Sequence, residues 1–261
     1  MGSGLGCGFS QPAAPHPRAM TEARMYDDFM GLPLQEPIAI RWDDVSMSAP
    51  PSVTTRSRSM KLYFYPGACS LAPHIALREA AVPFDLVKTD VRGKKLEDGS
   101  DFLVVNSKGY VPALRLDNNE VLTENVAILQ YIGERNPAAK ILPAAGTLER
   151  SRVVEWLSFI NSEIHKGFSP LFNPDAAEDV KKYARGNITK RLDWLNGALG
   201  SKKYLTGEQF TVADGYLFVV LNWGHYTNVD IGQWANLKRL QETVGARPRV
   251  IEALKAEGLL Q

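Results

Sequence analysis

Residues 61–78 read K-L-Y-F-Y-P-G-A-C-S-L-A-P-H-I-A-L-R and pass from an apolar strand through a tight turn into a helix. The aromatic, β-prone run at the start is typical of a buried strand. Pro66 and Gly67 end it with a strong turn signal. Ser70 is expected to cap the helix that follows, whose apolar residues recur at helical spacing. This strand-turn-helix unit is the starting point for the fold.

Cys69 lies at the junction of that turn and helix. Unpaired N–H groups and the positive end of the helix dipole favour a thiolate at such a position, which suits a nucleophile. A single cysteine can equally be a small buried hydrophobic residue. A dithiol redox motif C-x-x-C would need a second cysteine at position 72, and this position is Ala72, so such a motif is excluded. The residues alone leave the reactive and the structural interpretation open.

The composition indicates a globular protein without a membrane or nucleic-acid partner. The chain has 261 residues, of which 44% are hydrophobic and 23% charged, enough for two domains. A net charge of +1 gives no reason to expect nucleic acid, and no run approaches the roughly 18 apolar residues of a membrane helix. Cys7 and Cys69 are too few and too differently placed for a disulfide framework. We therefore expect a reducing compartment, the cytoplasm.

Residues 1–59 differ in composition from the rest of the chain. They contain seven of the 16 prolines and no lysine, and they show neither helical nor strand periodicity. We expect a disordered leader. It lacks the apolar core of a signal peptide, and its acidic residues argue against a transit peptide. Met60 directly precedes the first strand and is the expected natural start.

The pattern from residue 60 to 140 predicts an α/β domain of thioredoxin-like order. Two strands joined by a helix imply a parallel pair. A polar loop, a hairpin and a further helix capped by Thr123 come next. The expected elements are a strand at 61–65, a helix at 70–80, a strand at 84–89, a loop at 91–105, hairpin strands at 113–116 and 120–122, and a helix at 124–135.

Strand signals disappear after the linker 141–147, and residues 147–261 predict an all-α domain. Amphipathic patterns of this kind pack as a helical bundle. Thr211 and Asp214 have the spacing of a capping box, with Asp in place of the usual Glu. The expected helices are 148–168, 174–199, 211–223, 233–244 and 248–254.

Three separated motifs in this order resemble the glutathione S-transferases, and in particular their bacterial beta-type branch. They are M-K-L-Y-F-Y-P-G-A-C-S at 60–70, G-Y-V-P-A-L together with L-T-E-N-V-A-I-L-Q-Y-I within 109–132, and G-E-Q-F-T-V-A-D at 207–214. The resemblance covers residues 60–261. It implies a thioredoxin-like domain followed by a helical domain, and a cis peptide bond before Pro112.

The resemblance also implies a glutathione site. Val111 would offer its backbone N–H and C=O to the cysteinyl part of the ligand. Glu124 and Asn125 would hold the γ-glutamyl end at a helix N-terminus, and Lys94 would approach the glycyl carboxylate. Glu124 could instead be an ordinary first-turn acid that complements the helix dipole, and Lys94 a solvated surface residue.

The stretch W-L-S-F-I-N-S-E-I-H-K-G-F carries the remaining predicted site residues. By resemblance Ser162, Glu163, His165 and Lys166 would face Cys69 and the cleft, and part of the stretch would reach the neighbouring subunit's site. His165 could also be a satisfied core histidine. By resemblance, Cys69 and His165 are the predicted catalytic residues, and a cationic neighbour such as His165 would help to stabilise the Cys69 thiolate. His74 is interpreted as structural.

The resemblance implies a detoxifying glutathione transferase. It would conjugate reduced glutathione to small electrophiles and exchange disulfides through Cys69. Glutathione would be a co-substrate, with no further cofactor and no metal, and the protein would be a homodimer. Two alternatives remain open: a glutaredoxin-like thiol transferase, and a binding protein that keeps the fold without turnover.

Overall fold

The computed structural model describes residues 59–260. The predictions about a disordered leader and about Cys7 concern residues outside this range. Ser59 is the one leader residue within it, and its hydroxyl donates a hydrogen bond to Asp85 Oδ2 at 2.8 Å. Among the described helices, none is both long enough and apolar enough to cross a bilayer.

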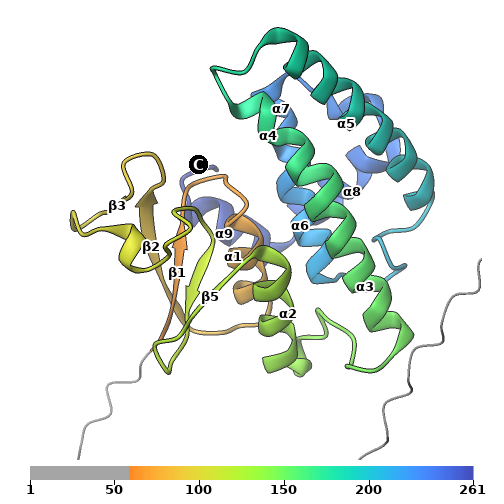
Figure 1. Cartoon of the computed structure of the whole chain (residues 1–261). Coiled ribbons are helices and arrows are strands. Elements are labelled where there is room, and N and C mark those ends of the chain that lie inside the picture. Colours follow the sequence, from red (N-terminus) through yellow and green to blue (C-terminus); the bar gives the residue numbers. More distant parts are fainter. Residues whose placement is uncertain (1–58, 261) are drawn as a thin grey trace, which may run out of the picture. The chain divides into compact units, whose positions relative to one another are not determined.

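A five-stranded mixed sheet forms the first part of the fold, with strand order β3-β2-β1-β4-β5 (Figure 1). The central pair β1 and β2 is parallel, and the other neighbours are antiparallel. The predicted parallel pair and hairpin are confirmed. The two-residue β3 was not predicted, because a strand so short has no periodicity. The bounds are β1 Met60–Phe64, β2 Phe84–Asp90, β3 Lys95–Leu96, β4 Ala113–Arg115 and β5 Val121–Thr123.

Two helices, α1 (Leu71–Glu79) and α2 (Asn125–Arg135), accompany this sheet, together with the short helical turns η3 (Phe102–Val104) and η4 (Pro137–Ala139). Both predicted side-chain caps are wrong. The backbone of Ser70 is already helical, and its hydroxyl bonds to the N–H and C=O of Tyr65 at 3.2 and 3.3 Å instead. Thr123 is the last residue of β5, and Glu124 occupies the N-cap position of α2.

The second part of the fold is entirely helical. The predicted helix 148–168 is continuous in space but contains a π-helical segment, η5, between α3 and α4. Such a segment inserts one residue per turn and often occurs at functional sites. The helices are α3 Leu148–Phe159, η5 Ile160–His165, α4 Lys166–Phe172, α5 Glu178–Leu199, α6 Val212–Asn222, α7 Gly224–Thr227, η6 Ile231–Gln233, α8 Ala235–Gly245 and α9 Pro248–Ala256.

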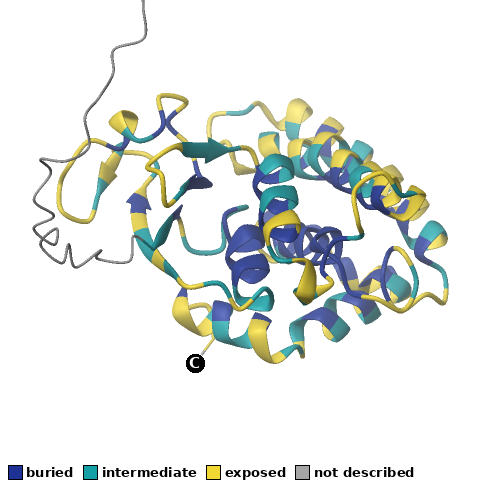
Figure 2. Ribbon diagram, turned by 90° about the horizontal axis from the view of Figure 1, so that it is seen from below, coloured by how far each residue is buried: buried dark blue, intermediate teal, exposed yellow. Residues whose placement is uncertain are grey.

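Helix α6 is the central helix of this part, and its residues from Val212 to Leu221 are all buried (Figure 2). The predicted capping box at its start is confirmed. Asp214 accepts hydrogen bonds from Thr211 N at 2.8 Å and from Leu205 N at 2.7 Å. Burial nevertheless raises the pKa of Asp214 to about 6, because the desolvation of a charged carboxylate outweighs these bonds.

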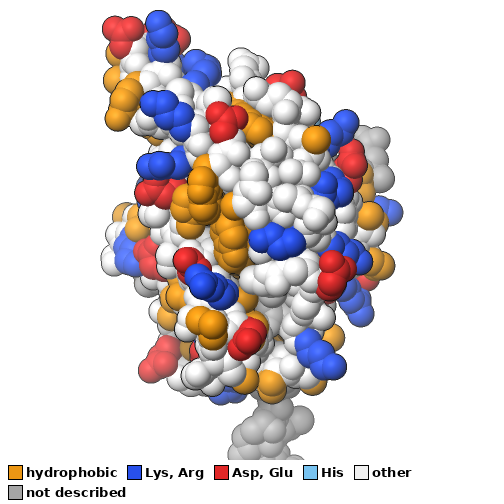
Figure 3. All heavy atoms as spheres, turned by 90° about the vertical axis from the view of Figure 1, so that its right-hand side faces the viewer, with side chains coloured by type: hydrophobic (Ala, Val, Ile, Leu, Met, Phe, Trp, Pro, Cys, Tyr) orange, Lys and Arg blue, Asp and Glu red, His pale blue; other side chains and the backbone are white. Residues whose placement is uncertain are grey.

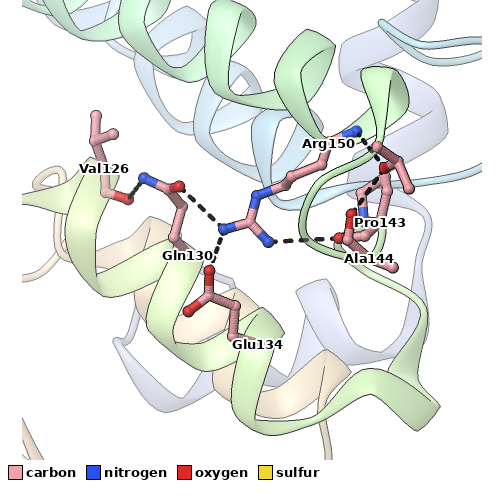
Figure 4. Close-up of polar contacts among 7 residues, drawn as sticks. Val126, Gln130, Glu134, Pro143, Ala144 and Arg150 are labelled. Carbon is pink, nitrogen blue, oxygen red and sulfur yellow. Dashed lines mark hydrogen bonds and ion pairs between the residues drawn. The ribbon is translucent and has the colours of Figure 1, made fainter.

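The sheet part and the helical part pack against each other closely. Helix α1 contacts both α6 and α9. Arg247 forms a two-pronged ion pair with Glu79, at 2.7 and 2.8 Å. Arg150, at the start of α3, reaches back to Gln130 Oε1 at 3.0 Å and to Glu134 on α2 (Figure 4). These contacts hold α1 and α2 against the helical part of the fold.

Candidate functional site

A cavity of about 210 Å³ lies where the turn before α1, the approach to β4, the start of α2 and the segment η5 meet. It brings together residues that are up to 97 positions apart in the sequence. Tyr110, Pro112 and Asn161 also line it, although they were not among the predicted site residues. The predicted site residues that line it are Cys69, Val111, Glu124, Asn125, His165 and Lys166.

The turn that carries Cys69 is held by contacts from the end of the chain. Glu257 accepts the N–H of Gly67 at 3.0 Å, and its other oxygen contacts His74 Nδ1 at 2.8 Å. The indole N–H of Trp223 donates to the carbonyl of Gly67 at 2.9 Å. His74 therefore lies outside the cavity and supports the turn, in agreement with its structural interpretation.

The thiol of Cys69 donates a hydrogen bond to the carbonyl of Val111 at 3.3 Å. Burial raises the pKa of Cys69 to about 12, although its own N–H, the Asn125 side chain and the Lys166 ammonium act in the opposite direction. The expected thiolate is therefore wrong for the free protein. The helix N-terminus is present as predicted, but desolvation of a buried charge is the larger effect.

The loop before β4 presents the backbone of Val111 to the cavity. The Val111–Pro112 peptide bond is cis, as the resemblance implies. Gly109 has a φ of 72°, a conformation that glycine adopts without strain. Lys94 Nζ donates to the carbonyls of Val91 and Gly109, both at 2.6 Å. Lys94 thus stabilises this loop through its backbone carbonyls, and it does not line the cavity.

Glu124 lies between β5 and α2 with a φ of 72°. Its Oε1 pairs with Lys108 Nζ at 2.6 Å and accepts the hydroxyl of Tyr110 at 3.4 Å. The hydrogen bond from Lys108 holds the pKa of Glu124 below its usual range. The adjacent Asn125 is 3% exposed, and its Oδ1 has no hydrogen-bond partner among the described residues. The start of α2 therefore offers a carboxylate and an unsatisfied amide to a ligand.

His165 is connected to a buried polar network on the helical side. Its Nδ1 lies 2.5 Å from the hydroxyl of Tyr216, which is fully buried on α6 and donates to Asn161 Oδ1 at 3.1 Å. Burial lowers the pKa of His165 to about 4, and the neighbouring Lys166 acts in the same direction. The imidazole is neutral near pH 7, so the expected cationic His165 is wrong, and Lys166 is the cation that lines the cavity.

Besides Lys94, two further predicted site residues, Ser162 and Glu163, do not line the cavity of their own chain. The hydroxyl of Ser162 donates to the carbonyl of Ser158 at 3.0 Å. Glu163 pairs with Arg191 on α5 at 2.7 Å. Asn161 and His165 share the face of η5 that turns toward Cys69, which leaves Ser162 and Glu163 on other faces. The implied reach into a neighbouring subunit's site stays a prediction.

Four residues at or beside the cavity were not among the predicted site residues: Lys108, Tyr110, Asn161 and Tyr216. Tyr216 could have been found, because its hydroxyl stands in the otherwise apolar run of α6 and requires a buried partner. Asn161 could also have been found, because it precedes His165 by four residues, a spacing that places two side chains on one face of a helix. Lys108 gave no signal beyond an exposed charge.

Comparison with known families finds two matching models. The model described as the glutathione S-transferase N-terminal domain matches residues 58–134, and the model of the C-terminal domain of the same family matches residues 159–248. The two matches lie in the order, and on the two parts, that the fold shows.

Individual relatives agree with these matches. The chain is 44% identical over 200 residues to glutathione S-transferase GstA of Escherichia coli O157:H7, covering 77% of this chain and 100% of that protein. It is 48% identical to the structure of a bacterial beta-class glutathione S-transferase of Sphingomonas chungbukensis, with a TM-score of 0.75 and coverage of 77% and 100%. A sphingomonad glutathione S-transferase structure complexed with glutathione is 47% identical, with a TM-score of 0.74 and coverage of 76% and 99%.

Proposed function

The chain belongs to the glutathione S-transferase family, and we propose that it conjugates reduced glutathione to small electrophiles in the cavity between α2 and η5. The observation that supports this most strongly is the convergence at one cavity of the Val111 backbone, the Glu124–Asn125 helix start and His165. No cofactor is needed beyond glutathione itself as a co-substrate.

The contacts around the cavity suit the three parts of glutathione. The backbone of Val111 can pair with the cysteinyl residue as a short added strand. The γ-glutamyl ammonium would replace Lys108 at Glu124, and the γ-glutamyl carboxylate would meet the N–H groups that begin α2. Lys94 would need to turn from its two carbonyl partners to reach the glycyl carboxylate.

In this pose the glutathione sulfur lies between Cys69 and His165. Cys69 stays protonated near neutral pH, because burial raises its pKa to about 12. It then acts as a hydrogen-bond donor toward the glutathione sulfur, and that sulfur is the nucleophile. Disulfide exchange through Cys69 remains a second candidate, since its thiol is the one that lines the cavity within residues 59–260.

An assay with two substrates tests both activities. The purified full chain is given glutathione with a chloronitrobenzene, and separately with a mixed disulfide. We expect saturable conjugation that survives Cys69→Ala, and a slower disulfide reduction that this variant abolishes, because the mixed disulfide needs the Cys69 sulfur. The absence of conjugation with several electrophiles would refute the main proposal.

We also propose a two-fold homodimer in the cytoplasm. A groove of about 1210 Å³ lies away from Cys69, over α2, α3 and α5. Trp156, Phe159 and Trp194 form an aromatic cluster in it, and Trp194 is 56% exposed. On the face shown in Figure 3, hydrophobic side chains gather in a band bordered by charged ones. An apolar surface of this kind fits a second copy of the chain.

A further inference from the structure

His165, Tyr216 and Asn161 form a hydrogen-bond network, and its contacts indicate which ring nitrogen of His165 carries the hydrogen. Asn161 and His165 belong to η5, and Tyr216 comes from α6, so two elements meet at the Tyr216 hydroxyl. Tyr216 is fully buried, and the contacts to His165 Nδ1 at 2.5 Å and Asn161 Oδ1 at 3.1 Å satisfy its hydroxyl on both sides.

The hydrogens in this network can be counted. A tyrosine hydroxyl has one hydrogen to donate, and an amide oxygen can only accept. Because the Asn161 amide is oriented with Oδ1 toward Tyr216, the Tyr216 hydrogen is directed to Asn161 Oδ1. The contact between Tyr216 and His165 also needs one hydrogen, which must then be on His165 Nδ1. A neutral imidazole with its hydrogen on Nδ1 has a lone pair on Nε2.

The position of the His165 ring directs the Nε2 lone pair toward the cavity. Nδ1 faces buried Tyr216, so the opposite edge of the ring, with Nε2, faces the cavity that His165 lines. Trp223 packs on the ring at 4.8 Å between centroids with an interplanar angle of 75°, and Tyr216 packs at 5.9 Å with 88°. These contacts oppose rotation. Nε2 makes no hydrogen bond to any residue between 59 and 260.

We propose that Asn161 and Tyr216 are positioning residues that fix His165 in the Nδ1–H tautomer, so that its Nε2 accepts the hydrogen of the glutathione thiol. The acceptance of the thiol hydrogen by Nε2 rests on the proposed function, whereas the assignment of the tautomer does not. The thiol S–H bond breaks, the proton moves to Nε2, and the electron pair stays on sulfur. Sulfur then bonds to the electrophilic carbon, a halide leaves with its electron pair, and the imidazolium returns its proton to solvent.

Four titratable or charged groups face this imidazole. Lys166 of the adjoining helix opposes protonation, and Glu124 from the start of α2 favours it. Cys69 is a neutral thiol at neutral pH, and Tyr216 is a neutral phenol because burial raises its pKa. A thiolate formed at the cavity would add a negative charge and so favour the imidazolium at the moment of transfer.

The direct test is the ¹⁵N spectrum of the imidazole nitrogens in the full chain at pH 7.5, with His165 assigned through His165→Gln. We expect a protonated Nδ1 and an unprotonated Nε2. Asn161→Asp keeps an acceptor and should keep this tautomer. Asn161→Leu removes the acceptor, frees the Tyr216 hydrogen for Nδ1, and should move the imidazole hydrogen to Nε2.

The kinetic consequence should follow the tautomer. Asn161→Leu and Tyr216→Phe should lower kcat for conjugation about tenfold or more, with little change in the KM for glutathione. Asn161→Asp should retain a clearly higher kcat than Asn161→Leu. If Tyr216→Phe fails to fold, the comparison of Asn161→Asp with Asn161→Leu still tests the proposal.

A protonated Nε2 in the unchanged protein would overturn the proposal, as would equal kcat values for Asn161→Asp and Asn161→Leu. An Nδ1–H imidazole in a protein that conjugates nothing would support the tautomer assignment and refute the proposed function.

Discussion

At the scale of single residues, the reactivity of Cys69 is decided by competition between two effects. The helix N-terminus and Lys166 favour the thiolate, and burial favours the thiol. We predict that iodoacetamide alkylates Cys69 more slowly than free glutathione at pH 7.5, with a rate that keeps rising at high pH. Measurement in a Cys7→Ser background isolates the site. A rate that is already maximal near neutral pH would contradict the burial argument.

Glu124 is the residue whose charge the ligand should need most. Changing it to Gln keeps the shape but removes the partner of the γ-glutamyl ammonium. A charge-assisted contact is worth about 1.5–3 kcal/mol, so the KM for glutathione should rise about tenfold or more. Glu120→Gln, in the exposed turn before β5, is the matched control. An unchanged KM would show that Glu124 does not bind glutathione and only complements the dipole of α2.

At the scale of elements, the periodic parts of the fold were predictable and the local details were not. The parallel pair, the hairpin and the capping box of α6 follow from apolar spacing and turn residues. The caps at Ser70 and Thr123 failed because a cap depends on backbone angles that the residue type does not determine. The π-helical η5 has the composition of an ordinary helix, so its i→i+5 hydrogen bonding could not be predicted. The shared face of Asn161 and His165 does follow from their four-residue spacing.

The capping box of α6 should contribute strongly to stability. Asp214 accepts hydrogen bonds from Leu205 N, Thr211 N and the Thr211 hydroxyl, all in a buried environment. Asp214→Ala leaves these donors without their acceptor, and we predict a loss of about 3 kcal/mol in the free energy of unfolding. Urea titration measures it. Asp179→Ala, in the exposed first turn of α5, should change little.

At the scale of the whole molecule, stability should depend on the protonation of His165. The unfolded chain binds a proton near pH 6.5, and the folded chain binds it only near pH 4, because burial lowers the pKa of His165 to about 4. Stability from this residue is therefore present above about pH 6.5 and is lost toward pH 4, by about 3 kcal/mol in total.

Asp214 opposes this trend, because burial raises its pKa to about 6 and acidification there favours the folded chain. The informative quantity is thus the difference between the unchanged protein and His165→Gln. Urea titrations at pH 7, 5.5 and 4.5 should show the unchanged protein losing stability relative to the variant. A difference that does not vary with pH would show that His165 is protonated equally in both states.

The proposed dimer gives a further prediction at this scale. Trp194→Glu places a charge in the groove of Trp156 and Phe159, and should shift sedimentation at micromolar concentration toward the monomer. Tyr226→Glu alters another exposed aromatic residue, on α7 and outside that groove, and should leave the sedimentation unchanged. A protein that is already monomeric would contradict the dimer proposal.

The backbone of Glu124 has a consequence for how this protein can evolve. Its φ of 72° and ψ of 122° suit glycine, and a residue with a side chain holds such angles at a cost of about 1–3 kcal/mol. Glu124→Gly would relieve that strain and remove the carboxylate at the same time. Selection for thermal stability alone would therefore favour glycine at this position, so the persistence of Glu124 would have to come from selection for what its side chain binds.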